Sequence, residues 1–303
     1  MSISLNKMST EQRNQHTMNL DNMSALDIVT EMNREDATIA EAIQPCLPKI
    51  AEVAEWAAES LSSGGRVFYM GAGTSGRIGV LDASECPPTF GISPDKVVGL
   101  IAGGPGAIIK SVEGAEDSME LGANDLKKNK LEKMDLVVGL AASGRTPYVI
   151  GGIKYANSVG CRTVAISCNR ESQIGKISDC AIDVVVGPEV LTGSTRLKAG
   201  TAEKMILNMI STTAMVKLGK VYENLMVDVV QSNEKLQARA ENIVMAATGA
   251  NKETAKKMIG MSDGNCKIAI VMLLAKCTKV MAIQLLKENN GSVRMAVSKA
   301  RNI

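Results

Sequence analysis

The chain has 303 residues, of which 45% are hydrophobic and 22% charged, a composition typical of a soluble globular protein with one large domain or a large and a small one. The net charge is +2 and the basic residues are scattered, which predicts no polyanion partner such as nucleic acid or an acidic membrane surface. Aromatic residues make up only 2%, which also argues against a base-stacking surface.

The cysteine pattern predicts neither a disulfide framework nor a zinc site, because the seven cysteines are odd in number and none forms a CxxC pair. The polar N-terminus lacks the apolar core of a signal peptide, and no apolar run reaches the length of a membrane span. We therefore expect a reduced, cytoplasmic protein that does not associate with a membrane.

The first 22 residues are polar and are predicted to be partly extended. Ser24 is expected to cap a helix over residues 25–36, since the apolar periodicity begins directly after it. A second helix is predicted over 37–62. Pro45 and Pro48 are expected to kink or split it, because proline lacks the N–H that a helix interior uses.

From residue 66 onward, short apolar segments alternate with helical patterns. The predicted strands are 66–70, 97–101, 135–143, 162–167 and 181–186. The predicted helices are 75–85, 107–128, 146–159 and 197–219. Near-continuous apolar strands separated by helices predict an α/β fold with a doubly wound, mostly parallel sheet of the flavodoxin-like kind. Ligands of such sheets bind beyond the carboxyl ends of the strands.

After residue 230 only helical patterns remain. They cover 231–246, 251–260, 265–275, 278–288 and 292–301. We predict two domains, an α/β domain with its N-terminal helices over 1–230 and a small helical domain over 231–303. The helical domain is expected to serve packing or dimerisation rather than chemistry.

The loop after the first predicted strand raises two alternatives. Gly71, Gly73 and Gly76 fit the G-x-G-x-x-G pattern of dinucleotide-binding proteins. NAD binding also needs an acidic residue at the end of the second strand, to hold the ribose hydroxyls. That position holds Ala102 or Gly103, so NAD lacks its second anchor and another phosphate is the better interpretation.

Hydroxyl side chains are concentrated in three turns, each at the start of a predicted helix. The first turn holds Thr74 and Ser75 after Gly73, the second holds Ser143 and Thr146 around Gly144, and the third holds Ser194, Thr195 and Thr201. Free backbone N–H groups and the positive end of a helix dipole favour a dianionic phosphate, and short hydroxyls add donors without filling the pocket. Two turns in matching strand-end positions, together with a third Ser/Thr-rich turn, predict one phosphate cradle.

The same turns carry a resemblance to a known family. GAGTSGR and AASGRTP resemble the two phosphosugar-binding turns of the SIS (sugar isomerase) domain, which implies a SIS-type sheet. Longer stretches resemble the N-acetylmuramic acid 6-phosphate etherase family over nearly the whole chain. They are TEQRN (10–14), IGVLDASECPPTF (78–90), VEGAEDS (112–118), AASGRTPYV (141–149), TGSTRLKAGTA (192–202) and NLMVDVVQSNEKL (224–236).

The resemblance implies cleavage of a lactyl ether at C3 of a phosphosugar, giving N-acetylglucosamine 6-phosphate and D-lactate. It assigns the catalytic pair to Glu85, as the acid for the lactyl oxygen, and Glu116, as the partner in proton transfer. A glutamate acting near pH 7 needs its pKa raised by burial or by a nearby negative charge. Cys86 and the prolines after it predict apolar surroundings for Glu85.

The helix spacing limits how Glu85 can act. Ten residues separate it from Ser75, about 15 Å along a straight helix. Either the helix ends early, as Pro87 and Pro88 encourage, or Glu85 serves the site of a second subunit. We predict a homodimer with Glu85 near the interface.

Four cations in the ligand turns are candidates for the lactyl carboxylate, and the sequence does not choose among them. They are Arg77, Arg145, Arg196 and Lys198. No cluster of metal ligands occurs in the sequence, and elimination next to a carbonyl needs no redox cofactor. We therefore predict neither a metal nor a cofactor.

Two other functions are compatible with the fold. A non-catalytic sugar-phosphate sensor of the SIS family would have no need for two placed carboxylates. A hexose phosphate isomerase would want a ring-opening base such as histidine. The only histidine, His16, lies in the polar N-terminal segment and is expected at the surface.

Overall fold

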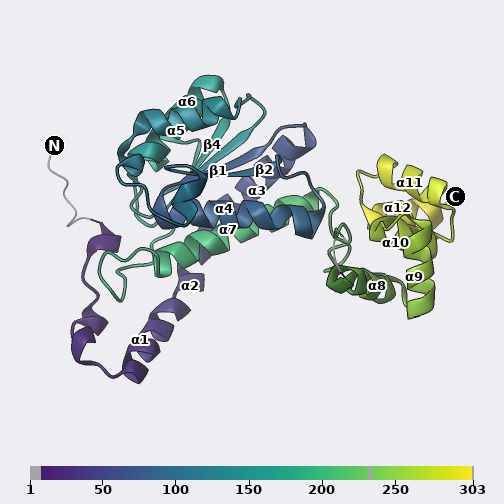
Figure 1. Cartoon of the computed structure of the whole chain (residues 1–303), viewed down its shortest axis with the longest axis horizontal. Coiled ribbons are helices and arrows are strands. Elements are labelled where there is room, and N and C mark those ends of the chain that lie inside the picture. The colour runs from purple at the N-terminus through teal and green to yellow at the C-terminus, as the bar shows by residue number, and fades with distance from the viewer. Residues whose placement is uncertain (1–7, 231–233, 302–303) are drawn as a thin grey trace. The chain divides into compact units, whose positions relative to one another are not determined.

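The computed structural model describes residues 8–230 and 234–301. Its centre is a five-stranded parallel sheet in the order β2-β1-β3-β4-β5 (Figure 1). This order is the flavodoxin-like one, so the predicted doubly wound α/β fold is confirmed. The strands are β1 (Val67–Gly71), β2 (Val97–Ile101), β3 (Leu136–Leu140), β4 (Arg162–Ser167) and β5 (Cys180–Asp183).

Two strands end earlier than the sequence predicts. β3 stops at Leu140 rather than at residue 143, and β5 stops at Asp183 rather than at 186. The ladder continues by one bond beyond each strand, since the N–H of Ala141 bonds Ile166 O and the N–H of Val184 bonds Ser167 O. The residues that follow then leave the sheet to form the turns at its carboxyl edge.

Helices cover both faces of the sheet. α5 (Met119–Lys128) and α6 (Pro147–Val159) lie over the face that carries Phe68 and Met70. α4 (Gly73–Phe90) covers the opposite face, where Gly79 packs on Tyr69. α7 (Lys198–Lys217) runs beside α4 (Figure 1), and the amide of Asn208 donates a 2.7 Å hydrogen bond to Asp82.

The predicted helix over 107–128 is wrong in its first half. Residues Pro105–Ile108 and Ala115–Asp117 form 3-10 turns, and α5 begins only at Met119. Gly104 and Gly114 have φ of 75° and 72°, a conformation that a helix does not continue through. Ser118 then accepts the N–H of Leu121 as a cap. Glu116 therefore lies in a loop instead of a helix.

The expectation that α4 ends before Pro87 and Pro88 is also wrong. The helix includes both prolines and ends at Phe90, before Gly91 with its φ of 62°. The ring of proline fixes φ near the helical value, so each proline forgoes its own N–H bond without forcing the helix to end.

The N-terminal elements follow the prediction after residue 24. Ser24 caps α1 (Ala25–Ala37), and the predicted second helix is split into α2 (Ile39–Ile43) and α3 (Leu47–Ser62) by a 3-10 turn that contains Pro45. The segment before α1 forms 3-10 turns at Ser9–Glu11, Gln15–Thr17 and Leu20–Asn22, where an extended chain was expected; residues 1–7 lie outside the described part.

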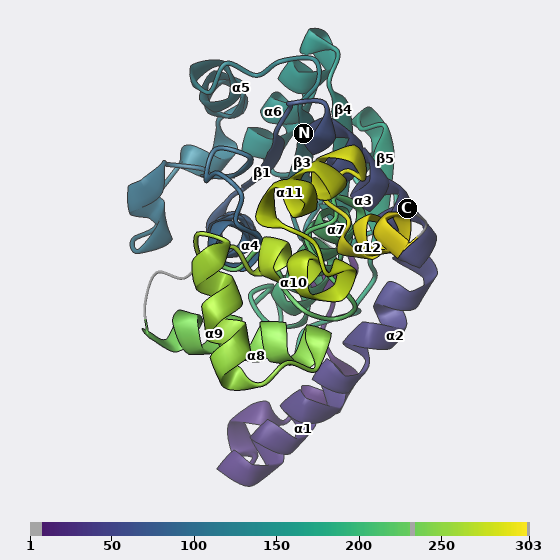
Figure 2. The ribbon, with the colours of Figure 1, turned by 90° about the vertical axis from the view of Figure 1, so that its right-hand side faces the viewer.

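Contacts divide the chain into two compact units, residues 1–84 with 95–211 and residues 85–94 with 212–303. In the second unit, the described helices from α8 to α12 pack around α10 (Figure 2). They are α8 (Glu234–Thr248), α9 (Lys252–Met261), α10 (Cys266–Ala275), α11 (Lys279–Glu288) and α12 (Val293–Arg301), close to their predicted ranges; residues 231–233 of the first predicted range lie outside the described part. A domain boundary at residue 230 stays a proposal.

Within the described residues, no single helix is long and apolar enough to cross a membrane; the sharply bent pair of α9 and α10 meets that limit only on length and composition.

Candidate functional site

The glycine loop, residues 71–76, joins β1 to α4 in a very tight turn. A Cβ on Gly76 would lie 2.6 Å from the carbonyl oxygen of Gly71, and Gly73 has a φ of 53°. A side chain at position 76 would clash with the backbone, and the φ of Gly73 favours glycine. The first N–H groups of a helix lack intrahelical partners, and the helix dipole adds positive potential there. The loop can therefore bind an anion through its backbone.

The Ser143–Thr146 turn occupies the matching position after β3. Gly144 has a φ of 71°, and a Cβ there would lie 2.3 Å from the Cβ of Ser172. The N–H of Arg145 donates to Ser143 Oγ at 3.4 Å, and Thr146 precedes the first residue of α6. Because β1 and β3 are neighbours in the sheet, the two turns lie at the same edge.

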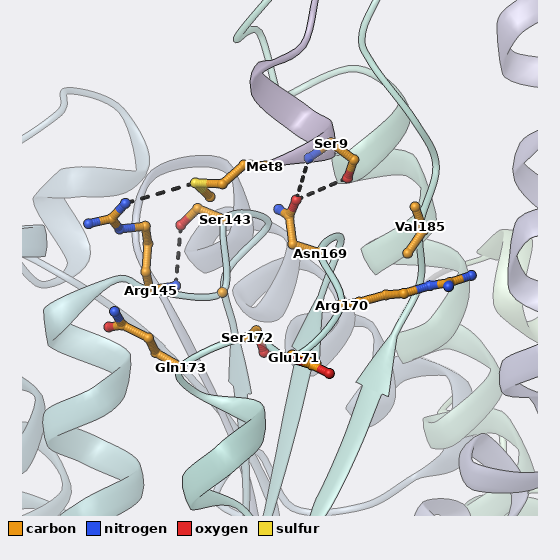
Figure 3. A pocket seen from close by; sticks show the side chains of 11 residues that line it. Met8, Ser9, Ser143, Arg145, Asn169, Arg170, Glu171, Ser172, Gln173 and Val185 are labelled. Atoms are coloured by element: carbon orange, nitrogen blue, oxygen red, sulfur yellow. Dashed lines mark hydrogen bonds between the residues drawn. The ribbon is translucent and has the colours of Figure 1, made fainter. Parts of the chain in front are cut away.

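A cavity of about 380 Å³ opens beside the Ser143–Thr146 turn, and we call it the turn cavity (Figure 3). The N-terminal segment forms one wall, since the N–H and hydroxyl of Ser9 donate to Asn169 Oδ1 at 2.8 and 2.9 Å. The side chain of Arg145 lies beside Met8, with a nitrogen 3.9 Å from the sulfur, whereas Arg170 extends past Val185 (Figure 3).

A second, smaller cavity of about 230 Å³, the loop cavity, lies against the glycine loop. Gly73 and Glu116 both line it, so the structure brings these two predicted site residues together. Arg77 lines it too, but its guanidinium donates to the carbonyl oxygens of Ala107 and Ile108, both at 2.8 Å. Arg77 thus holds the 3-10 turn that forms one wall.

Glu85 lies further along α4 and belongs by its contacts to the second compact unit. Its side chain is exposed, whereas the neighbouring Cys86 is buried. The apolar surroundings that were expected for Glu85 do not arise within a single chain.

The third predicted turn held Ser194, Thr195 and Thr201, and the structure separates them: Thr201 is exposed and donates to Leu197 O at 2.9 Å. Ser194 and Thr195 are half-buried and Arg196 is exposed, while Lys198 is only 3% exposed and is paired with Glu35. His16, expected at the surface, is 67% exposed by its side chain but bonds the other oxygen of Glu35. Burial would raise the pKa of Glu35, but the hydrogen bonds from Lys198 and His16 outweigh it and lower that pKa to about 2.

Packing connects this turn to the glycine loop. A Cβ on Gly200 would lie 3.2 Å from Thr74 Cγ2 and 3.4 Å from the carbonyl oxygen of Thr195. The N–H groups of Lys198 and Ala199 at the start of α7 are bound by Glu189, at 2.9 and 3.0 Å. The dipole end of α7 is therefore already occupied by a carboxylate of the chain itself.

One further ionisable residue of this region was not predicted from the sequence. Glu203 of α7 is fully buried, and Ser75 Oγ lies 2.9 Å from its Oε1. Burial, opposed by the hydrogen bond to Ser75, raises the pKa of Glu203 to about 8. The sequence held a signal for it, because Glu203 interrupts the buried stripe of Ala199, Ala202, Ile206 and Ile210 on α7.

Among the residues that the structure describes, no three His, Cys, Asp or Glu side chains converge in a way that could hold a metal ion.

Comparison with known proteins gives consistent results. Models of the glucokinase regulatory protein N-terminal SIS domain and of the SIS domain match residues 49–157 and 115–213. The chain is 57% identical to an N-acetylmuramic acid 6-phosphate etherase of Pectobacterium atrosepticum over 97% of both chains. It is 52% identical to one of Photorhabdus laumondii over 99% of this chain and 100% of the relative. A phosphoheptose isomerase structure from Francisella tularensis has a TM-score of 0.50 at 16% identity, over 64% of this chain and 100% of that one, and thus shares the fold.

Proposed function

The chain belongs to the N-acetylmuramic acid 6-phosphate etherase family, and on that premise we propose that it cleaves the D-lactyl ether of N-acetylmuramic acid 6-phosphate to N-acetylglucosamine 6-phosphate and D-lactate. The observation that carries this proposal is the 52–57% identity to named etherases over nearly the full length of both partners. It favours an enzyme over a non-catalytic sensor, whose sequence would have no reason to follow the etherases so closely.

The reaction is an elimination followed by a hydration, which makes the enzyme a carbon–oxygen lyase. In the open-chain sugar the C1 carbonyl acidifies the proton on C2. A base takes that proton, the C3–O bond breaks, and an acid protonates the departing lactyl oxygen. Water then adds across the C2–C3 double bond, with its oxygen at C3. The chemistry needs two proton-transferring groups beside a fixed phosphosugar.

The phosphate is assigned to the edge shared by the two turns. Its donors are the backbone and hydroxyls of Gly73, Thr74, Ser75, Ser143, Gly144 and Thr146, with Ser194 and Thr195 as further candidates. The starts of α4 and α6 supply N–H groups and positive dipole ends to this edge, which supports a dianion there.

Glu116 is assigned to proton transfer at C2, because it lines the loop cavity with Gly73. A phosphosugar held at the glycine loop would extend into that cavity. Glu85 is assigned as the acid for the lactyl oxygen, acting in the site of a second subunit. Its exposure, together with the distance of about 15 Å from Ser75 along the continuous helix α4, supports this role and a homodimer.

Arg145 is the best candidate for the lactyl carboxylate. Arg77 is bound to two carbonyl oxygens and Lys198 is paired with Glu35, so neither can easily turn to a ligand. Arg196 is exposed. Arg145 lines the turn cavity, and within the described residues its guanidinium is held only by a long contact to a sulfur. This leaves its planar fork able to bind a carboxylate with two hydrogen bonds.

We also propose a cytoplasmic location. All seven cysteines are free thiols, which suits a reducing compartment.

Incubation with N-acetylmuramic acid 6-phosphate in ¹⁸O-labelled water tests the function. We expect release of unlabelled lactate and a sugar phosphate with the label at C3. Binding without turnover would instead support the sensor, and label in the lactate would contradict elimination at C3.

Mixed dimers test the assignment of Glu85 to the second subunit. Glu85→Ala and Glu116→Ala chains are each expected to be inactive. If Glu85 acts across a dimer interface, random mixing of the two gives one complete site in half of the dimers, or about a quarter of wild-type activity. No recovery on mixing would contradict it, and Glu41→Ala, at another exposed position, serves as the control.

A further inference from the structure

A buried carboxyl group lies directly behind the glycine loop. Glu203 Oε1 is 2.9 Å from Ser75 Oγ, and both residues are buried, at 0% and 8% exposure. The other carboxyl oxygen, Oε2, is buried and has no hydrogen-bond partner among the described residues. An ionised carboxylate with an unsatisfied oxygen is costly in such a place, and a protonated one costs much less.

Among the residues that the structure describes, no cation pairs with Glu203. The other titratable groups on the elements packed around it are Cys168 after β4, Glu189 before α7, those on α4 (Arg77, Asp82, Glu85 and Cys86) and those on α7 itself (Lys198, Lys204 and Lys217). Arg77 is bound to the carbonyl oxygens of Ala107 and Ile108, and Lys217 is exposed. Burial raises the pKa values of Cys168, Glu189 and Asp82. Lys198 is paired with Glu35, and Lys204 is exposed.

We propose that Glu203 is a positioning residue, whose protonated carboxyl donates its hydrogen to Ser75 Oγ and so frees the serine hydroxyl to donate to the phosphate of the substrate. This inference rests on the proposed function, because it takes the phosphosugar as the ligand of the glycine loop.

The same 2.9 Å contact can carry a hydrogen in either direction. When the carboxyl is protonated, it donates, and the serine hydrogen is available to the ligand. When the carboxyl is ionised, it accepts the serine hydrogen and places a negative charge behind the bound phosphate. A phosphate is already largely dianionic above its second pKa of about 6, so the ligand itself changes little from pH 7 upward. The raised pKa of Glu203, about 8, sets the pH at which binding weakens.

The test measures the Kd of N-acetylglucosamine 6-phosphate from pH 6.5 to 9.5, with the full-length wild type and two variants. For the wild type we expect a constant Kd below pH 7.5 and a weakening that approaches tenfold per pH unit above pH 8. Glu203→Gln, a neutral isostere whose amide can donate to Ser75, should bind within about threefold of the wild type at pH 7 and show no alkaline weakening.

Ser75→Ala provides a second variant. It removes the phosphate donor, so its binding should be weaker at every pH. It also removes the hydrogen bond that lowers the pKa of Glu203, so the remaining alkaline change should move to higher pH.

A wild-type Kd without an alkaline rise, or the same rise in Glu203→Gln, would overturn the inference. Because binding is measured with the product sugar phosphate, the result is separable from the proposed function. Lactate release with a flat Kd profile would refute only the role of Glu203, while the expected profile without lactate release would refute only the etherase activity.

Discussion

The glycine loop after β1 and the Ser143–Thr146 turn after β3 lie at the same sheet edge, yet different groups surround them. The glycine loop is backed by the buried acid Glu203 and opens on the loop cavity, which Glu116 lines. The Ser143–Thr146 turn is backed by Ser172 and opens on the turn cavity, with Arg145 beside it.

The difference suggests a division of labour between two turns that look alike in sequence. Each offers a helix start and short hydroxyls to the phosphate that we propose they share. The β1 side adds Glu116 and the buried Glu203, carboxyl groups that suit proton transfer. The β3 side adds Arg145, which suits recognition of the lactyl carboxylate, although the exposed Glu171 lines the turn cavity too. Substitutions on the two sides should therefore affect different kinetic quantities.

The largest expected effect comes from the carboxylate of the loop cavity. Glu116→Gln removes a group assigned to proton transfer and should lower kcat by about 10²- to 10⁴-fold, with little change in the Kd of the product sugar phosphate. Glu113→Gln is the matched control, because Glu113 lines the same cavity and is equally exposed. If both variants lost the same amount of kcat, the proposed division of roles between the two turns would be contradicted, because Glu116 would then contribute only to the local fold.

The next effect is on stability and requires no ligand. The pKa of Glu203 is raised in the folded protein to about 8, above its ordinary value of 4.5, so folding takes up a proton between these pH values. The stabilisation is complete below pH 4.5 and is lost as the pH rises through 8. The free energy of unfolding should fall by about 1.4 kcal/mol per pH unit within that window.

Denaturant unfolding of the wild type and of Glu203→Gln between pH 5.5 and 9 measures this contribution. The difference in the free energy of unfolding between the wild type and Glu203→Gln should change by about 3 kcal/mol from pH 5.5 to 7.5 and level off above pH 8. A difference that stays constant with pH would mean that Glu203 is ionised in the fold.

A smaller loss is expected from the glycine loop itself. In Gly76→Ala the new Cβ would lie 2.6 Å from the carbonyl oxygen of Gly71, and a backbone atom cannot move away as a flexible side chain can. We expect a loss of about 2 kcal/mol in stability, with weaker phosphosugar binding. Gly106→Ala is the control, because a Cβ there meets nothing within 4 Å. If Gly76→Ala were as stable as the wild type, the loop backbone would be able to shift and accept a Cβ at this position.

The sequence predicts the elements at the carboxyl edge of the sheet well, but it predicts poorly which charged groups meet there, and both results have one physical reason. Apolar runs and glycine spacing are local, so β1, β4 and the helices α6 to α12 could be predicted to within a few residues. The contacts that decide charge join distant residues. Ser75 and Glu203 are 128 positions apart and Glu35 and Lys198 are 163 apart, so no local pattern pairs them.

The missed loop before α5 has a different cause. Residues 107–118 carry enough helix formers to suggest a helix, but Gly104 and Gly114 adopt positive φ and Ser118 caps the helix only where the chain reaches Met119. Each glycine also tolerates a helix, so the choice depends on tertiary packing. Arg77, which bonds Ala107 and Ile108 from another element, is part of that packing.

The smallest expected effect tests the β3 side. Arg145→Lys keeps the charge but loses the planar fork, so the KM for N-acetylmuramic acid 6-phosphate should rise by about tenfold. The Kd of N-acetylglucosamine 6-phosphate, which has no lactyl group, should change much less. The ratio of the change in KM to the change in Kd then isolates recognition of the carboxylate. Arg170→Lys is the control from the same cavity. If both ligands were weakened equally, Arg145 would act at the phosphate instead of at the lactyl carboxylate. The two turns would then differ only in their carboxyl groups.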